Sequence, residues 1–206
     1  MMKYTIGYIN HNKEVFNEYL GNSILNLDGF FMVLSTSDQG KPAKNYNELL
    51  SRCKTKYLIL THQDISFSKN LLDNIDKTIE ELSGNFGALC LVGVDSLGQY
   101  FWSDDKIPHE VSTSDGCFVV INTENNLKFD EYIFDDYHLY VEDYCCQLSL
   151  IGEKIYTILT SSNVNYNEDS YILHHGSTVS EKGFCWGKYP EYKEKFKNKW
   201  PGFYTT

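Results

Sequence analysis

The stretch that decides the fold is YLILTHQDISFSKN, residues 57–70, in which an apolar run meets His62, Gln63 and Asp64. A short apolar run of this kind is typical of a strand that is buried on both faces. In open α/β sheets the ligand lies beyond the carboxyl ends of the parallel strands. The stretch therefore predicts a buried strand that ends at a binding crevice.

Similar runs precede and follow this strand, with amphipathic segments between them. The predicted strands of the first half are Tyr4–Ile9, Phe30–Ser35, Tyr57–Thr61 and Phe86–Val92. The predicted helices are Glu14–Leu25, Tyr46–Cys53 and Ser68–Leu82, the last with Ser68 as its N-cap. Strands that alternate with helices predict a βαβαβ core with a mostly parallel sheet.

The second half is turn-rich after Val92 and then resumes the alternation. The sequence predicts strands at Gly116–Ile121, Lys154–Leu159 and Tyr171–His174, and helices over 141–152 and from Pro190. No repeat or Pro-rich linker occurs. We therefore expect a single domain over 1–206, with two functional halves at 1–95 and 96–180 and a basic aromatic tail at 181–206.

Composition narrows the class of protein. Of the 206 residues 42% are hydrophobic, which predicts a globular chain, and the net charge of −10 disfavours nucleic acid as a partner. No apolar run is long enough to span a bilayer, so a cytoplasmic location is expected. The six cysteines lack C-x-x-C spacing and are expected to be reduced packing residues.

The tail has a local positive charge that the rest of the chain lacks. Residues 182–200 contain six lysines among aromatic residues. This pattern fits peripheral membrane contact or a partner surface, and it also fits a solvated terminal helix. We favour the solvated helix.

Polar residues follow three consecutive predicted strands. Asn10, Asp38 and Asp64 each lie just beyond a strand end. Their convergence on one crevice is the geometry expected of a nucleotide pocket.

Five sequence blocks carry a resemblance to a known family. They read YINHNKEVFNEYLGNSIL, KNYNELLSRCKTKYLILTHQDI, SDGCFVVI, KFDEYIFDDYHLYVEDYCCQLSLIG and ILHHGS. In this order, over residues 4 to about 178, they resemble family-two-type glycosyltransferases, namely the bacterial glycosyltransferase-like branch with H-Q-D in place of D-x-D. The resemblance implies a GT-A (nucleotide-diphospho-sugar transferase) fold, a Rossmann-like three-layer α/β/α arrangement with a mostly parallel central sheet.

The same resemblance implies a metal and donor site. Asp64 with His174 or His175 would bind Mn²⁺ or Mg²⁺, because hard oxygen ligands and imidazole suit these ions. His62 stands where the family has its first carboxylate, and it is expected to line the pocket rather than to bind the metal. The expected donor contacts are Asn10, Asp38, Asn45, His62, Asp64 and Asp115.

The resemblance also implies an acceptor side. Asp143 is the expected general base, and Glu142 the neighbour that orients it or binds the acceptor. Trp102 and His138 are the expected acceptor contacts. Each has a structural alternative: Trp102 and His138 as packing residues, and the earlier Asn10, Asn45 and Asp64 as caps or turn residues.

The resemblance thus implies an inverting, metal-dependent, hexosyltransferase-type enzyme. It would transfer a sugar from a nucleotide-diphospho-sugar, UDP-sugar foremost, to a glycan or lipid-linked acceptor in bacterial surface polysaccharide synthesis. The alternative is a catalytically inactive GT-A-like protein that binds a nucleotide or a glycan. A nucleotidyltransferase is disfavoured, since GYINHNKEVF is not a Gly-rich basic loop.

Overall fold

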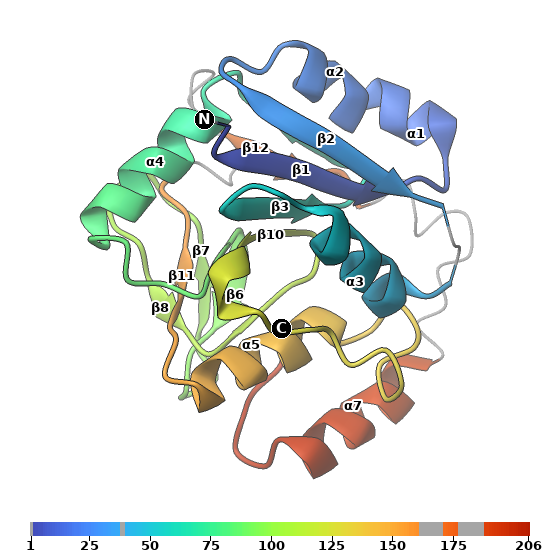
Figure 1. The fold of residues 1–206 in the computed structure, drawn as a ribbon. Helices are drawn as coiled ribbons and strands as arrows, with labels where there is room; N and C mark the ends of the chain where they lie inside the picture. The colour runs from blue at the N-terminus through green and yellow to red at the C-terminus, as the bar shows by residue number, and fades with distance from the viewer. Residues whose placement is uncertain (1, 38–39, 161–170, 177–187) are drawn as a thin grey trace.

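The computed structural model describes residues 2–37, 40–160, 171–176 and 188–206, and its centre is a mixed sheet (Figure 1). The strands lie in the order β2-β1-β3-β10-β5-β11-β8. Their bounds are β2 Phe31–Thr36, β1 Tyr4–Ile9, β3 Tyr57–Thr61, β10 Phe118–Asn122, β5 Ala88–Cys90, β11 Ile155–Thr157 and β8 Glu110–Val111. Strands β2, β1, β3, β5 and β11 run in one direction, and β10 and β8 run in the other. The predicted mostly parallel α/β sheet is confirmed.

The register of this sheet brings strand ends together. Tyr8 of β1 pairs with Thr61 of β3, and Phe118 of β10 pairs with the same Thr61 from the other side. Residues just after β1 and β3, and just before β10, therefore lie next to one another at the same end of these strands.

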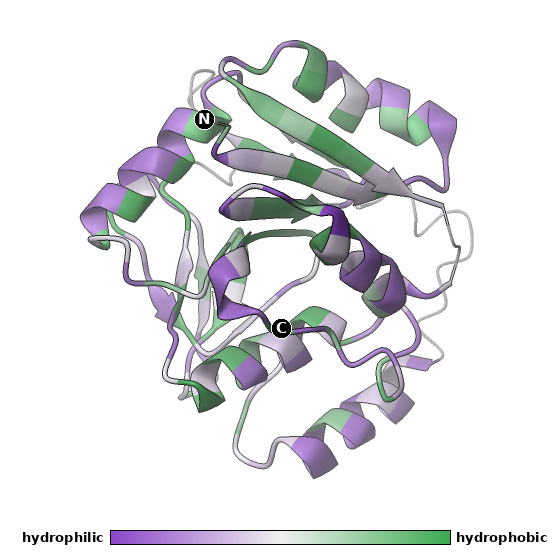
Figure 2. Cartoon of the chain, viewed as in Figure 1, coloured by the Kyte–Doolittle hydropathy of each residue, from purple (hydrophilic) through white to green (hydrophobic). Residues whose placement is uncertain are grey.

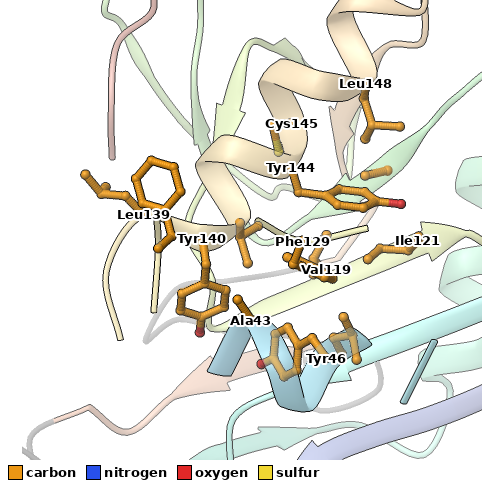
Figure 3. Close-up of a cluster of buried hydrophobic side chains, with 14 of the residues drawn as sticks. Ala43, Tyr46, Val119, Ile121, Phe129, Leu139, Tyr140, Tyr144, Cys145 and Leu148 are labelled. Atoms are coloured by element: carbon orange, nitrogen blue, oxygen red, sulfur yellow. The ribbon is translucent and has the colours of Figure 1, made fainter. Parts of the chain in front are cut away.

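Helices cover both faces of the sheet. Successive strand residues point to opposite faces, and because both sets are largely hydrophobic, each face is packed against helices. One core cluster includes Leu58 and Leu60 and lies under helices α3, α5 and α7. Figure 3 shows the part of this cluster that lies between α3 and α5. The other includes Tyr57 and Ile59 and lies under α2 and α4. The helix bounds are α1 Lys13–Glu18, α2 Leu20–Leu25, α3 Pro42–Arg52, α4 Leu71–Glu81, α5 Tyr140–Leu150 and α7 Tyr189–Lys199. Figure 2 shows the hydrophobic residues along the strands and the hydrophilic ones along the outer sides of α4 and α7. The arrangement is the predicted three-layer α/β/α.

Two small sheets flank the central one. In the first, β4 Ile65–Phe67 pairs with β12 Ile172–His174, and His174 lies opposite Ile65. In the second, the order is β7-β6-β9, with β7 Tyr100–Trp102, β6 Val92–Val94 and β9 Thr113–Ser114. A 3-10 turn, η1 Thr123–Asn125, follows β10. The first small sheet carries the late part of the chain back to the end of β3.

Several predicted elements differ from the observed ones. Helix α3 begins at Pro42 rather than at Tyr46, and β11 is shorter than the predicted Lys154–Leu159. The predicted helix Glu14–Leu25 is split into α1 and α2 at Tyr19, where the helical backbone is interrupted. Ser68 is not the N-cap of α4, because its amide donates to the Tyr171 carbonyl oxygen and extends the β4–β12 ladder. The predicted strand Phe86–Val92 is split into β5 and β6, because the chain leaves the central sheet to pair with β7.

The terminal helix begins as predicted, with Pro190 in its first turn. It is more than a solvated helix, since Tyr192 and Phe196 are buried in the core cluster under α5. Part of the predicted tail, residues 181–187, lies outside the described residues, as does Cys185. The five described cysteines are free. Among the described helices none has the length and apolar character needed to cross a bilayer.

Candidate functional site

A cavity of about 370 Å³ lies at the carboxyl end of β3. Residues from both halves of the chain contribute to its wall. They are His62, Asp64, Asp115, Gly116, Tyr137, His138, Leu139, Tyr140, Glu142, His174, Gly176, Tyr189 and Thr206. The cavity is therefore the place where the predicted donor and acceptor residues could meet.

One end of the cavity holds a cluster of His62, Asp64 and His174. Asp64 Oδ2 lies 3.4 Å from His174 Nε2, and Asp64 Oδ1 lies 4.0 Å from His62 Nδ1. One ligand atom from each of the three residues lies within 4.8 Å of the other two. Two imidazoles and a carboxylate are a donor set that suits a divalent transition ion such as Mn²⁺, so the residues fit the predicted metal.

The charges of this cluster depend on one another. Burial disfavours the ionised form of Asp64, but the neighbouring His174 outweighs burial and holds the pKa of Asp64 below its usual value. Burial likewise opposes the charged form of His174, and Asp64 outweighs it and raises the pKa of His174. Burial and the nearby His174 lower the pKa of His62. In the metal-free cluster Asp64 is therefore ionised and His62 is neutral, and these are the forms that bind metals. The raised pKa of His174 favours its protonated form, so a metal would have to displace that proton.

The structure distinguishes the two adjacent histidines. His174 contributes to the cluster, whereas the side chain of His175 hydrogen-bonds through Nε2 to Ser66 Oγ at 2.7 Å. The His175 ring also stacks on Tyr19, with ring centroids 4.2 Å apart. Of these two histidines, both predicted as metal ligands, only His174 lines the cavity.

Gln63 has a structural role that sequence reasoning missed. Its Oε1 accepts hydrogen bonds from the amides of His11 and Asn12 at 3.0 and 2.8 Å, and its Nε2 donates to Asn10 Oδ1 at 3.2 Å. Gln63 therefore fastens the loop between β1 and α1 to the end of β3. Residues 62–64 form a turn between β3 and β4, where strand alternation does not apply, so the sequence carried no signal of this role.

The other predicted donor contacts are divided by the structure. Asp115 lines the cavity, and its Oδ1 accepts from the Cys117 amide at 2.7 Å. Asn10 binds Gln63, and buried Asn45 donates to the Lys41 carbonyl oxygen at 2.8 Å within its own helix. Neither asparagine lines the cavity. Asp38 lies outside the described residues.

The two adjacent carboxylates of α5 face different surroundings. Glu142 lines the cavity, where its Oε1 accepts a hydrogen bond from Thr206 Oγ1 at 2.8 Å. Burial, with Asp115 as the next cause, raises the pKa of Glu142 to about 8. A carboxyl group with this pKa exchanges a proton near neutral pH, as a general base requires.

Asp143 points away from the cavity and is completely buried. Its Oδ1 accepts from Lys199 Nζ and from Trp200 Nε1, each at 2.7 Å, and its Oδ2 accepts from Gln147 Nε2 at 2.8 Å. Successive helix residues are about 100° apart around the axis, so the two side chains cannot share one surface. Asp143 joins α5 to the end of α7.

The two predicted acceptor contacts also differ. His138 is buried in the cavity wall, and its ring packs against Tyr189 and Tyr192 with centroids 5.6 and 5.7 Å away. Trp102 lies in β7 with 57% of its surface exposed and does not line the cavity. Thr206 and Tyr189, which do line it, were missed because nothing in the sequence indicates how the chain end folds back.

No protein-family model matches the chain. A curated protein of Fuscovulum blasticum, described as "ATP synthase subunits region ORF 6", is 22% identical over 176 residues, which cover 76% of this chain and 66% of that protein. The chain thus spans just under two thirds of this relative.

The fold of this chain is similar to that of several solved structures. GalNAc-T7 with UDP, GalNAc and Mn²⁺ has a TM-score of 0.61 at 8% identity, covering 84% of this chain and 44% of its own. S. aureus TarS 1-349 has a TM-score of 0.58 at 14% identity, covering 88% and 63%. The mannosyltransferase PcManGT from Pyrobaculum calidifontis, in complex with GDP-Man and Mn²⁺, has a TM-score of 0.53 at 12% identity, covering 97% and 70%. The chain has the GT-A fold.

Proposed function

We propose that this chain is a glycosyltransferase domain that uses a nucleotide-diphospho-sugar as donor. The observation that carries the proposal is the cavity at the end of β3, which has the His62, Asp64 and His174 cluster and the carboxyl group of Glu142 in one wall. A cluster suited to a cation and a titrating carboxyl group in one cavity match the two needs of the reaction, a stabilised leaving diphosphate and a proton acceptor.

The cluster would hold a divalent cation, Mn²⁺ in the first place and Mg²⁺ as the alternative. When bound, such an ion would act as a Lewis acid toward the diphosphate of the donor. Asp64 supplies the negative charge, and His174 is held against it at 3.4 Å. Solved proteins of the same fold with UDP or GDP-Man and Mn²⁺ support this choice of ligand class.

Glu142 takes the role that the sequence assigned to Asp143. An acceptor hydroxyl must lose its proton as it attacks the anomeric carbon, and the proton acceptor has to reach the cavity. Glu142 does so, whereas the oxygens of Asp143 are bound to Lys199, Trp200 and Gln147. Direct attack by the acceptor would invert the anomeric centre, as predicted for a hexosyltransferase-type enzyme.

Two further groups of the cavity would serve substrate binding. Asp115 would accept hydrogen bonds from donor hydroxyl groups, and His138 would contact the acceptor. A glycan or lipid-linked acceptor, bacterial surface polysaccharide synthesis, UDP as the favoured nucleotide and a cytoplasmic location with peripheral membrane contact remain predictions from the sequence.

The proposal is tested by turnover of a donor panel. UDP-, GDP-, CDP- and dTDP-sugars are incubated with the protein and Mn²⁺, and release of the nucleoside diphosphate is measured. We expect one nucleotide class to be turned over, and Asp64→Asn to lower the rate by about a hundredfold, as for loss of one group that stabilises developing charge. The exposed Asp28→Asn is the matched control and should leave the rate unchanged.

Two results would contradict this account. Binding without turnover of any donor would favour the inactive nucleotide- or glycan-binding alternative. Equal rates for wild type and Asp64→Asn would show that the cluster has no part in the reaction.

A further inference from the structure

We propose that Tyr140 is a positioning residue, which turns His62 so that this histidine becomes a third metal ligand through Nδ1. The inference rests on the proposed function, because it concerns the metal cluster of the same cavity. It goes further in naming a ligand that replaces the first carboxylate of D-x-D, and the hydroxyl that orients it.

The two nitrogens of the His62 ring face different neighbours. His62 Nε2 lies 3.3 Å from the hydroxyl oxygen of Tyr140, and His62 Nδ1 lies 4.0 Å from Asp64 Oδ1. When Nε2 carries the proton and donates to Tyr140, Nδ1 keeps its lone pair on the side of Asp64. Metal-binding histidines are held in this way, with the second ring nitrogen donating to a neighbouring group.

The side chain of Tyr140 is itself fixed in place. It is 3% exposed, and its ring packs edge-on against Tyr46 with centroids 5.5 Å apart (Figure 3). The Tyr140 hydroxyl oxygen would lie 3.1 Å from a β-carbon at Gly116, so the glycine leaves the room that the hydroxyl occupies. Leu139, with φ of 60°, adopts a left-handed conformation as α5 begins at Tyr140. A side chain packed in this way can fix the orientation of its partner.

With His62 as a ligand, the site also has a preference between Mn²⁺ and Mg²⁺. A site with two imidazoles and one carboxylate favours Mn²⁺ over Mg²⁺, because Mg²⁺ prefers oxygen ligands. We therefore expect Mn²⁺ to bind at least about tenfold more tightly than Mg²⁺. His62→Asp, which restores D-x-D, should narrow this difference.

The test compares two tyrosines of one helix. Mn²⁺ binding to the purified full chain is measured by calorimetry for wild type, Tyr140→Phe and Tyr144→Phe. Tyr144 is also buried in α5, but it stacks on Phe129 and does not line the cavity. We expect Tyr140→Phe to weaken Mn²⁺ binding by about 10- to 100-fold, the usual loss when a group that orients a ligand is removed, and Tyr144→Phe to bind as wild type.

A second readout follows the orientation of His62 without any metal. Long-range ¹⁵N–¹H NMR of the metal-free protein should show His62 with its proton on Nε2 in wild type and a mixture of both tautomers in Tyr140→Phe. If Tyr140→Phe fails to fold, Gly116→Ala is used in its place, since the added methyl group crowds the hydroxyl while the phenol remains.

The outcomes separate this inference from the proposed function. Equal Mn²⁺ affinities of wild type and Tyr140→Phe, or a wild-type His62 with its proton on Nδ1, would overturn the role of Tyr140 and leave the glycosyltransferase proposal standing. Absence of any Mn²⁺ binding by the wild-type chain would overturn both.

Discussion

Glu142 and Asp143 are neighbours in the chain, yet they belong to two different regions of the molecule. Glu142 lies in the cavity wall with Thr206, and Asp143 lies in the interface between α5 and α7 with Lys199 and Trp200. The pair teaches that a motif gives the type of chemical group, whereas the rotation of the helix decides which group faces the cavity.

The same contrast recurs at the end of β3. His62 and Asp64 line the cavity, and Gln63 between them holds the β1–α1 loop. In each case one residue is expected to act on ligands and its neighbour on stability. Substitutions at these residues separate the two effects.

The largest expected effect is that of Glu142→Gln on sugar transfer. Loss of a general base lowers turnover by about 10²- to 10⁴-fold, while the amide keeps the shape of the side chain. Wild-type turnover should rise as the pH approaches 8, because the base must lose its proton first. Initial rates over pH 6 to 9 check both points, and unchanged turnover in Glu142→Gln would remove Glu142 from the mechanism.

Asp143→Ala should act on stability instead. Among the described residues, the variant leaves the ammonium group of Lys199 with Asp130 as its one carboxylate partner and removes the acceptor of the Trp200 indole. Breaking such a buried pair costs about 3 kcal/mol of unfolding free energy. Urea unfolding measures this loss, and turnover per folded molecule should stay within about threefold of wild type. A variant of full stability that transfers no sugar would restore Asp143 as the base.

Gln63→Ala should have a smaller effect, confined to one loop. It leaves the amides of His11 and Asn12 without their side-chain acceptor and lowers the unfolding free energy by about 1 to 2 kcal/mol. Hydrogen exchange of these two amides should become faster, whereas Mn²⁺ affinity should stay as in wild type. A large loss of Mn²⁺ affinity would mean that Gln63 supports the metal cluster after all.

The smallest effect is a pH dependence of stability. The pKa of Glu142 is about 8 in the folded chain against an ordinary value of 4.5, so the folded state binds the proton more tightly. Its contribution to stability is full below about pH 4.5 and is lost as the pH rises through 8, with a fall of about 1 kcal/mol between pH 7 and 8. Urea midpoints at these two pH values should show the fall in wild type and lack it in Glu142→Gln.

The positions of the first strands along the chain were predictable because they depend on local patterns. Tyr4–Ile9 and Tyr57–Thr61 are mostly apolar, and both form strands with these bounds. Asp64 was predictable as a cavity residue because it follows a buried parallel strand, and ligands bind beyond the carboxyl ends of such strands. Local patterns thus gave the sheet and one end of the cavity.

The rest of the site depends on contacts between distant segments. The sequence left the choice between His174 and His175 open, and the pairing of β12 with β4 places His174 beside Asp64. The direction of Asp143 is set by Lys199, 56 positions further along the chain. No periodicity in α5 records such a partner, because Glu142 and Asp143 are both buried.

The central claim is that the cavity at the end of β3 binds a metal ion and the diphosphate of a nucleotide. Calorimetric titration with UDP, GDP, CDP and dTDP, each with and without Mn²⁺, tests it most directly. We predict Mn²⁺-dependent binding of one diphosphate in wild type and its loss in Asp64→Asn. Absence of binding of all four at millimolar concentration, or binding that is equal in Asp64→Asn, would contradict the account.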